Sequence, residues 1–124
     1  MLTAVISGKK RGTGFEGSLL KPGQAEGAED VLTASVFERI AYLPDDLFIS
    51  AFTTVLGVGI GAIETIEFWP SWYLADGRRV EPDVVISDGS QSLLVEAKRH
   101  DDYRQQSAGQ LAAELQAGWC EGKL

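Results

Sequence analysis

The chain has 124 residues, a hydrophobic content of 44% and a formal net charge of −7, which favours one soluble domain with a hydrophobic core. The negative balance argues against holding nucleic acid by bulk electrostatic attraction, but leaves open a site where carboxylates meet phosphates through a cation. The single cysteine and single histidine argue against a disulfide framework, a zinc site and a Ser-His-Asp triad. No apolar run could span a bilayer and no signal peptide is recognisable, so we expect a cytoplasmic protein without a membrane partner.

The N-terminal quarter of the chain is dense in glycine. This density predicts a glycine-rich arm or loop over residues 1–27, ahead of one domain over residues 28–124. Helical spacing of apolar residues then predicts a first helix over residues 28–43, ended by Pro44. The residues expected to face the core are Leu32, Val36, Ile40 and Leu43.

A second helix is expected over residues 46–56, burying Phe48, Phe52 and Val55 and closed by Gly57. The β-branched and aromatic segment 63–74 is expected to form a strand bent at Pro70. Its tryptophans are expected in the core or on the sheet surface, the alternative being a platform for stacking bases. Asp76-Gly77 is a strong turn signal.

Two further strands are expected over residues 80–86 and 93–98, separated by a polar turn at 87–92. Each strand carries an apolar triplet, and continuous apolarity is typical of strands buried on both faces. The last expected element is a helix over residues 101–117, with Leu111, Leu115 and several alanines.

The two triplets, paired as an antiparallel hairpin centred on the turn, set Val84 opposite Val95. One step further, Asp83 faces Glu96, and residues directly opposite have Cβ atoms about 4.5–5.5 Å apart. Because side chains alternate along a strand, Lys98 leaves on the same face as Glu96. Facing carboxylates destabilise a sheet unless a cation lies between them, and Mg²⁺ is the hard cation that such oxygen ligands suit, with Mn²⁺ as its substitute. Two carboxylates and a lysine therefore suit phosphodiester hydrolysis.

The segment Glu81-Pro82-Asp83, twelve residues, then Glu96-Ala97-Lys98 resembles the motif of the PD-(D/E)XK (restriction-endonuclease-like) nucleases. The expected order of helices and strands, over roughly residues 28–117, resembles their core as well. The resemblance implies an α/β fold in which helices flank a central mixed sheet and the site lies on a strand hairpin. It also implies a magnesium-dependent deoxyribonuclease of bacterial or phage type.

In the site that the resemblance implies, Asp83, Glu96 and the backbone carbonyl of Ala97 bind the metal, while Lys98 assists the attacking water. Relatives in this superfamily often add an acidic residue from the first helix. Glu29 is our candidate because it is in phase with the expected core face, whereas Asp30 is rotated by about 100°. Further candidates for contacts with nucleic acid or with the site are Gln106, Gln110, Arg79 and Arg99.

The sequence departs from the superfamily pattern after the last helix, where a final core strand is expected and only a few residues remain. Either the protein is a fragment, or a partner chain or second copy completes the sheet, since unpaired edges recruit partners, or the sheet keeps three strands. The alternative reading is therefore a catalytically inactive module of the same fold, which binds nucleic acid or assembles with protein.

Overall fold

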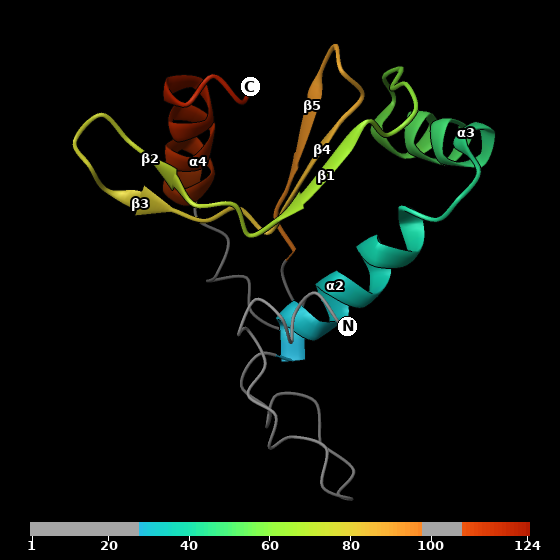
Figure 1. Cartoon of the computed structure of the whole chain (residues 1–124), viewed down its shortest axis with the longest axis horizontal. Helices are drawn as coiled ribbons and strands as arrows, with labels where there is room; N and C mark the ends of the chain where they lie inside the picture. The colour runs from blue at the N-terminus through green and yellow to red at the C-terminus, as the bar shows by residue number, and fades with distance from the viewer. Residues whose placement is uncertain (1–27, 98–107) are drawn as a thin grey trace, which may run out of the picture.

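The computed structural model of the chain describes residues 28–97 and 108–124. Figure 1 shows a mixed α/β arrangement of helices and short strands. The helices are α2 (Ala28–Ile40), α3 (Asp45–Leu56) and α4 (Ala108–Cys120). The strands are β1 (Thr65–Phe68), β2 (Trp72–Tyr73), β3 (Arg79–Val80), β4 (Val84–Ser87) and β5 (Ser92–Val95). The expected arm over residues 1–27 lies outside the described residues.

The larger sheet has the strand order β1-β4-β5, and β2 pairs with β3 in a separate hairpin. The described strands all pair antiparallel, whereas the sequence predicted a mixed sheet. The expected Asp76-Gly77 turn joins β2 to β3: Gly77 has a positive φ of 84°, and the Asp76 carboxylate accepts a hydrogen bond from Arg78 N at 2.9 Å.

Each of the strands predicted over residues 63–74 and 80–86 is divided in two. The first breaks at Trp69, which has a φ of 47°, and at Pro70. The second breaks before Asp83 at the buried Pro82, which has no N–H to donate to a ladder. Trp69 N donates to Asp83 O at 3.0 Å. The two breaks therefore lie side by side, where the chain passes between the two sheets.

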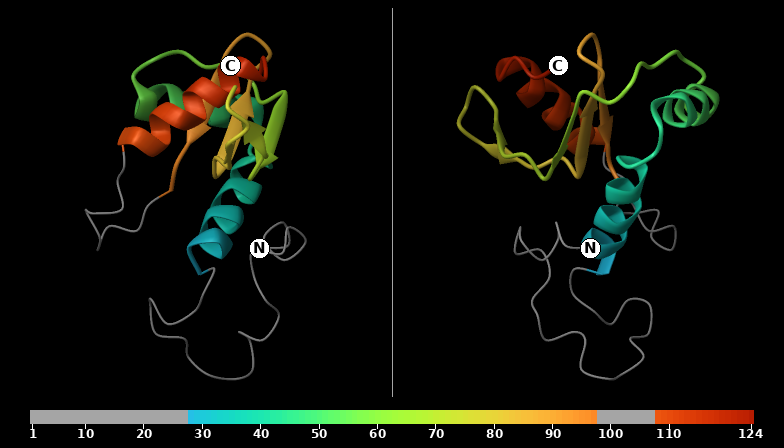
Figure 2. Two further views of the ribbon diagram at one scale, coloured as in Figure 1. Left: turned by 90° about the vertical axis from the view of Figure 1, so that its left-hand side faces the viewer. Right: turned by 45° about the vertical axis from the view of Figure 1, so that its right-hand side comes forward.

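Helices cover both faces of the larger sheet. Helices α2 and α3 lie on one side, and α4 lies on the other side beside the β2–β3 hairpin (Figures 1 and 2). Val84 and Ile86 pack in the cluster of Phe48, whereas Val85 packs in the cluster of Trp72 and Ala117. Strand β4 is therefore buried on both faces, as predicted, while β5 is half-buried. The tryptophan core prediction is also confirmed, because Trp69 and Trp72 are buried.

The inward face of α2 agrees with the predicted face only at Ile40, which packs against the cluster of Phe48. Leu32, Val36 and Leu43 are 61%, 43% and 39% exposed, respectively. Ala34 and Val31 pack against Trp69, and Phe37 packs against the cluster of Phe48. The helix carries apolar residues around most of its circumference, so the spacing alone did not determine which stripe would be buried.

The bounds of α3 and its end agree with the sequence prediction: Phe48 is buried, and Gly57 is left-handed with a φ of 71°. The prediction that Val55 is buried is wrong, because Val55 is 81% exposed. Helix α4 turns a different face inward than its leucines suggest. Leu111 and Leu115 are 42% and 47% exposed, whereas Glu114, Ala117 and Gly118 are buried. No helix in the described part of the chain is long and apolar enough to cross a membrane.

Candidate functional site

Asp83 stands at the start of the central strand and is held against the end of β5. The hairpin has the predicted register, with Val84 opposite Val95 and Ile86 opposite Leu93. Beyond the last pair of this ladder, Asp83 Oδ2 accepts a hydrogen bond from the backbone N–H of Ala97 at 2.8 Å. The carboxylate therefore lies beside the Glu96-Ala97 segment, the segment that the sequence set opposite it.

Glu96 lies on the α4 side of the sheet, because Gln110 of α4 donates a hydrogen bond to it. Alternation along β5 likewise sets Glu96 on the face of Leu94. Val85 and Leu94 pack in the cluster that contains Ala117 of α4. Asp83 and Glu96 are both half-buried.

Gln110, in the first turn of α4, joins Glu96 to a second glutamate. Its Nε2 donates to Glu96 Oε1 at 2.9 Å and to Glu114 Oε1 at 2.9 Å. An amide nitrogen carries two hydrogens, so each carboxylate can receive one. Of the two glutamines predicted as contacts, Gln110 reaches the site, and Gln106 lies outside the residues that the structure describes.

Glu114 is the feature that sequence reasoning missed. Its side chain is only 1% exposed, and its Oε2 is buried without a hydrogen-bond partner among the described residues. A glutamate on a helix is ordinarily a solvent-facing residue, so nothing marked it as buried. The only sequence signal is helical spacing. Glu114 follows Gln110 by four residues and precedes Ala117 by three, so the three residues lie on one side of α4.

The other predicted site residues are placed only in part. Lys98 and Arg99 lie outside the described residues, and the side chain of Glu29 is not described either. Arg79 forms an ion pair with Glu81 and donates from Nε to Ser71 Oγ at 3.0 Å. Its guanidinium is therefore engaged on the β2–β3 side of the molecule.

The choice of Glu29 over Asp30 rested on the predicted face of α2. The stripe that packs inward contains Ala34 and Phe37, and Asp30 precedes them by four and seven residues. Residues at this spacing share one side of a helix, so the observed phase favours Asp30, which is partly buried. Ile40 of the predicted face also packs inward, and the side chain of Glu29 is not described, so the assignment of Glu29 stays a prediction.

No group of three or more His, Cys, Asp or Glu side chains within residues 28–97 and 108–124 is placed to hold a metal ion. Two carboxylates are described near the base of the hairpin: that of Asp83, hydrogen-bonded to the backbone of Ala97, and that of Glu96, hydrogen-bonded to Gln110. These are oxygen ligands of the kind that hard divalent cations prefer.

The opposite end of the hairpin is organised by Asp88. Its Oδ1 accepts backbone N–H groups from Ser90 and Gln91 at 2.9 Å, and its Oδ2 accepts from Gly61 N at 2.7 Å. The backbone donors, chiefly that of Gly61, hold the pKa of the Asp88 carboxyl well below its ordinary value. This carboxylate ties the turn to the segment after α3 and so fixes the hairpin register from its far end.

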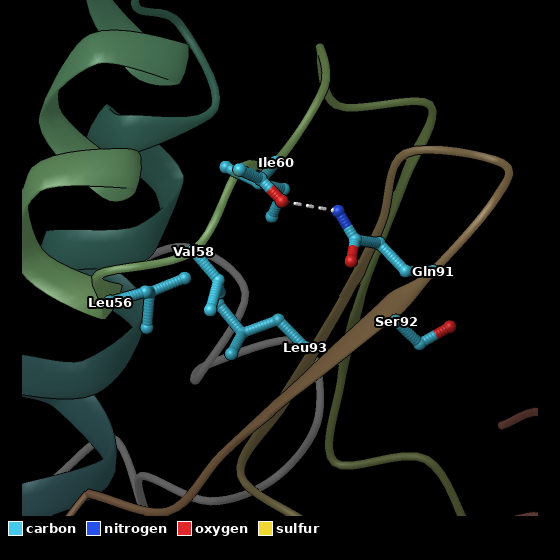
Figure 3. A pocket seen from close by; sticks show the side chains of 7 residues that line it. Leu56, Val58, Ile60, Gln91, Ser92 and Leu93 are labelled. Carbon is cyan, nitrogen blue, oxygen red and sulfur yellow. Dashed lines mark hydrogen bonds between the residues drawn. The ribbon is translucent and has the colours of Figure 1, made fainter.

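A small pocket lies at this turn end, away from the motif carboxylates. Figure 3 shows Leu56, Val58 and Ile60 facing β5, and Gln91 closes one side by donating to Gly59 O at 2.7 Å. Apart from Gln91 and Ser92, its lining side chains are apolar. The pocket therefore offers no ionisable group for chemistry.

The chain is 43% identical over 118 residues to a protein of Pasteurella multocida described as uncharacterized, in a match that covers 93% of this chain and 46% of that protein. The chain thus spans about half the length of this relative. No family model matches the sequence. No solved structure matches either. The case for a function therefore rests on the residues and their geometry.

Proposed function

We propose that the protein is a metal-dependent nuclease of the PD-(D/E)XK type, which hydrolyses phosphodiester bonds of DNA. One observation carries the proposal: Asp83 accepts a hydrogen bond from Ala97 N at 2.8 Å, at the end of a hairpin with the predicted register. A short motif matches by chance in many sequences. Support comes from its two halves, twelve residues apart, being held together at one edge of the fold.

The donor chemistry of these residues fits a hard divalent cation. Asp83 and Glu96 would hold Mg²⁺ or Mn²⁺ together with the carbonyl oxygen of Ala97. When bound, the cation would neutralise charge on the scissile phosphate and favour ionisation of a water. Lys98 would hold the attacking water and supply a positive charge near the developing anion.

The test is nicking of supercoiled plasmid DNA in Mg²⁺ or Mn²⁺, with chelator as the blank. We expect the parent protein to cleave, and Asp83→Ala, Glu96→Ala and Lys98→Ala each to lose at least about a hundredfold in rate. Groups that act as one unit should be non-additive, so double variants should lose little more than single ones. The matched control is Glu67→Gln, which alters an exposed carboxylate on the neighbouring strand β1.

Circular dichroism should show that all variants are folded. Full activity in a folded triad variant, in a preparation free of contaminating nuclease, would contradict the assignment. The alternative, an inactive module of this fold for DNA binding or protein assembly, predicts a different pattern. In that case the parent would not cleave under any metal condition, and the triad variants would match it in binding DNA or protein.

A further inference from the structure

Helix α4 carries a buried carboxylate, that of Glu114, and burial of a carboxylate costs free energy. Glu114 is 1% exposed, on a helix face whose other buried members are Ala117 and Gly118. Removing a carboxylate from water is costly, and an apolar residue of similar volume at such a position is often neutral or stabilising. A site where a polar residue breaks the local packing rule points to function rather than to stability.

The hydrogen bonds of Glu114 lead to the candidate site. Gln110 is exposed, and an exposed long side chain would otherwise sample several rotamers. Its Nε2 is held between Glu114 Oε1 and Glu96 Oε1, at 2.9 Å from each. Because carboxylate oxygens accept and do not donate, this arrangement also fixes which end of the amide faces them.

The held amide in turn restrains Glu96. This residue follows β5, an outer strand of the described sheet, and its side chain is half-buried. A carboxylate that binds a cation works best when a neighbouring group fixes its rotamer before the cation arrives. Gln110 is placed to do this, and Glu114 holds Gln110 in position.

We propose that Glu114 is a positioning residue, which sets the rotamer of Glu96 through Gln110 and thereby raises the affinity of the site for a divalent cation. This inference rests on the proposed function, because it takes Glu96 to be a metal ligand. It adds to the motif a residue from a different element, and it gives α4 a role in the site as well as in the core.

The experiment removes the hydrogen-bonded connection from Glu96 through Gln110 to Glu114 in two ways, once at Glu114 and once at Gln110. Glu114→Leu removes the buried acceptor, whereas Glu114→Gln retains an acceptor oxygen and serves as the conservative variant. Gln110→Leu removes the same hydrogen bonds at an exposed residue of α4, so this variant is expected to keep the fold. Its matched control is Gln116→Leu, an exposed glutamine on the same helix that the link does not include.

The main readout is the dissociation constant for Mn²⁺, measured on the protein by calorimetry, with plasmid cleavage alongside. We expect Glu114→Leu and Gln110→Leu each to weaken Mn²⁺ binding by about tenfold, the scale known for groups that orient metal ligands. Glu114→Gln and Gln116→Leu should stay near the parent value. The double variant should be no weaker than either single variant, because both remove one link.

A second readout separates positioning from a structural role. In chelator, Glu114→Leu should melt at or above the temperature of the parent, since it removes a buried carboxylate. If both leucine variants bind Mn²⁺ as tightly as a parent that binds and cleaves, the positioning role is refuted. If Glu114→Leu does not fold, Gln110→Leu alone decides the question. A parent that neither binds Mn²⁺ nor cleaves would instead overturn the proposed function, and this inference with it.

Discussion

Replacing Asp83 with asparagine tests the physics of the site while keeping an acceptor for the hydrogen bond from Ala97. The amide keeps the size of the side chain, and its oxygen can still accept the Ala97 N–H, now received at 2.8 Å. Exchanging a charged acceptor for a neutral one costs about 1 kcal/mol. Removing the repulsion from Glu96 returns roughly 0.7–3 kcal/mol, for charges about 6 Å apart at effective dielectric constants of about 80 to 20. Without metal, Asp83→Asn should therefore be at least as stable as the parent.

Divalent metal should reverse this order. Binding to the folded state alone stabilises the parent by about 1.4 kcal/mol at ten times the dissociation constant and by about 2.7 kcal/mol at one hundred times. The variant has one fewer anionic ligand and should gain less. A difference of about 1 kcal/mol shifts the melting temperature of a domain of this size by a few degrees, which is readily measured.

Thermal melts of both proteins, in chelator and in millimolar Mn²⁺, decide the question, with Glu67→Gln as the control for loss of a carboxylate on the same sheet. The reasoning is refuted if Asp83→Asn loses more than about 2 kcal/mol in chelator and Mn²⁺ shifts neither protein. Asp83 would then be a structural carboxylate that holds the backbone of Ala97, and the nuclease proposal would lose its main support.

Two further predictions concern the turn and the first helix. The pKa of Asp88 is held well below its ordinary value of 3.8, so its contribution to stability is complete above that pH and is lost as the pH falls through and below it. The melting temperatures of the parent and Asp88→Ala should therefore differ at pH 7 and begin to converge as the pH falls below 3.8. A constant gap down to pH 3 would show that any stabilisation by Asp88 does not depend on its charge. On α2, Asp30→Asn should weaken Mn²⁺ binding more than Glu29→Gln, and the opposite order would restore the original assignment.

The hairpin that carries the motif was predictable because several independent signals agree on it. Two apolar triplets flank a polar turn, and only one register brings both to the core, so the pairing of Val84 with Val95 followed from the sequence. The Asp76-Gly77 turn and the closure of α3 at Gly57 depend on glycine at positive φ, which is a local requirement. Such features need no knowledge of the tertiary structure.

The features that sequence reasoning missed depend on contacts between distant segments. Which stripe of α2 is buried depends on where Trp69 and Phe68 lie, and the sequence of α2 offers apolar residues on more than one side. The division of the predicted strands follows from the passage of the chain between two sheets at Trp69 and Pro82. Burial of Glu114 follows from how α4 approaches the sheet. Pro70 and Pro82 mark the strand breaks locally, but neither the buried stripe of α2 nor the burial of Glu114 is encoded in a local pattern.

The central position of β4 has a consequence for how the candidate site tolerates change. Asp83 precedes the strand that has neighbours on both edges and cover on both faces, whereas Glu96 follows β5, which has one described neighbour. Segments with the most buried contacts open last in native-state fluctuations, and outer strands open earlier. One half of the site is thus anchored in the slowest-opening part of the domain. Backbone change in the candidate site is therefore expected to be tolerated better beside Glu96 than beside Asp83.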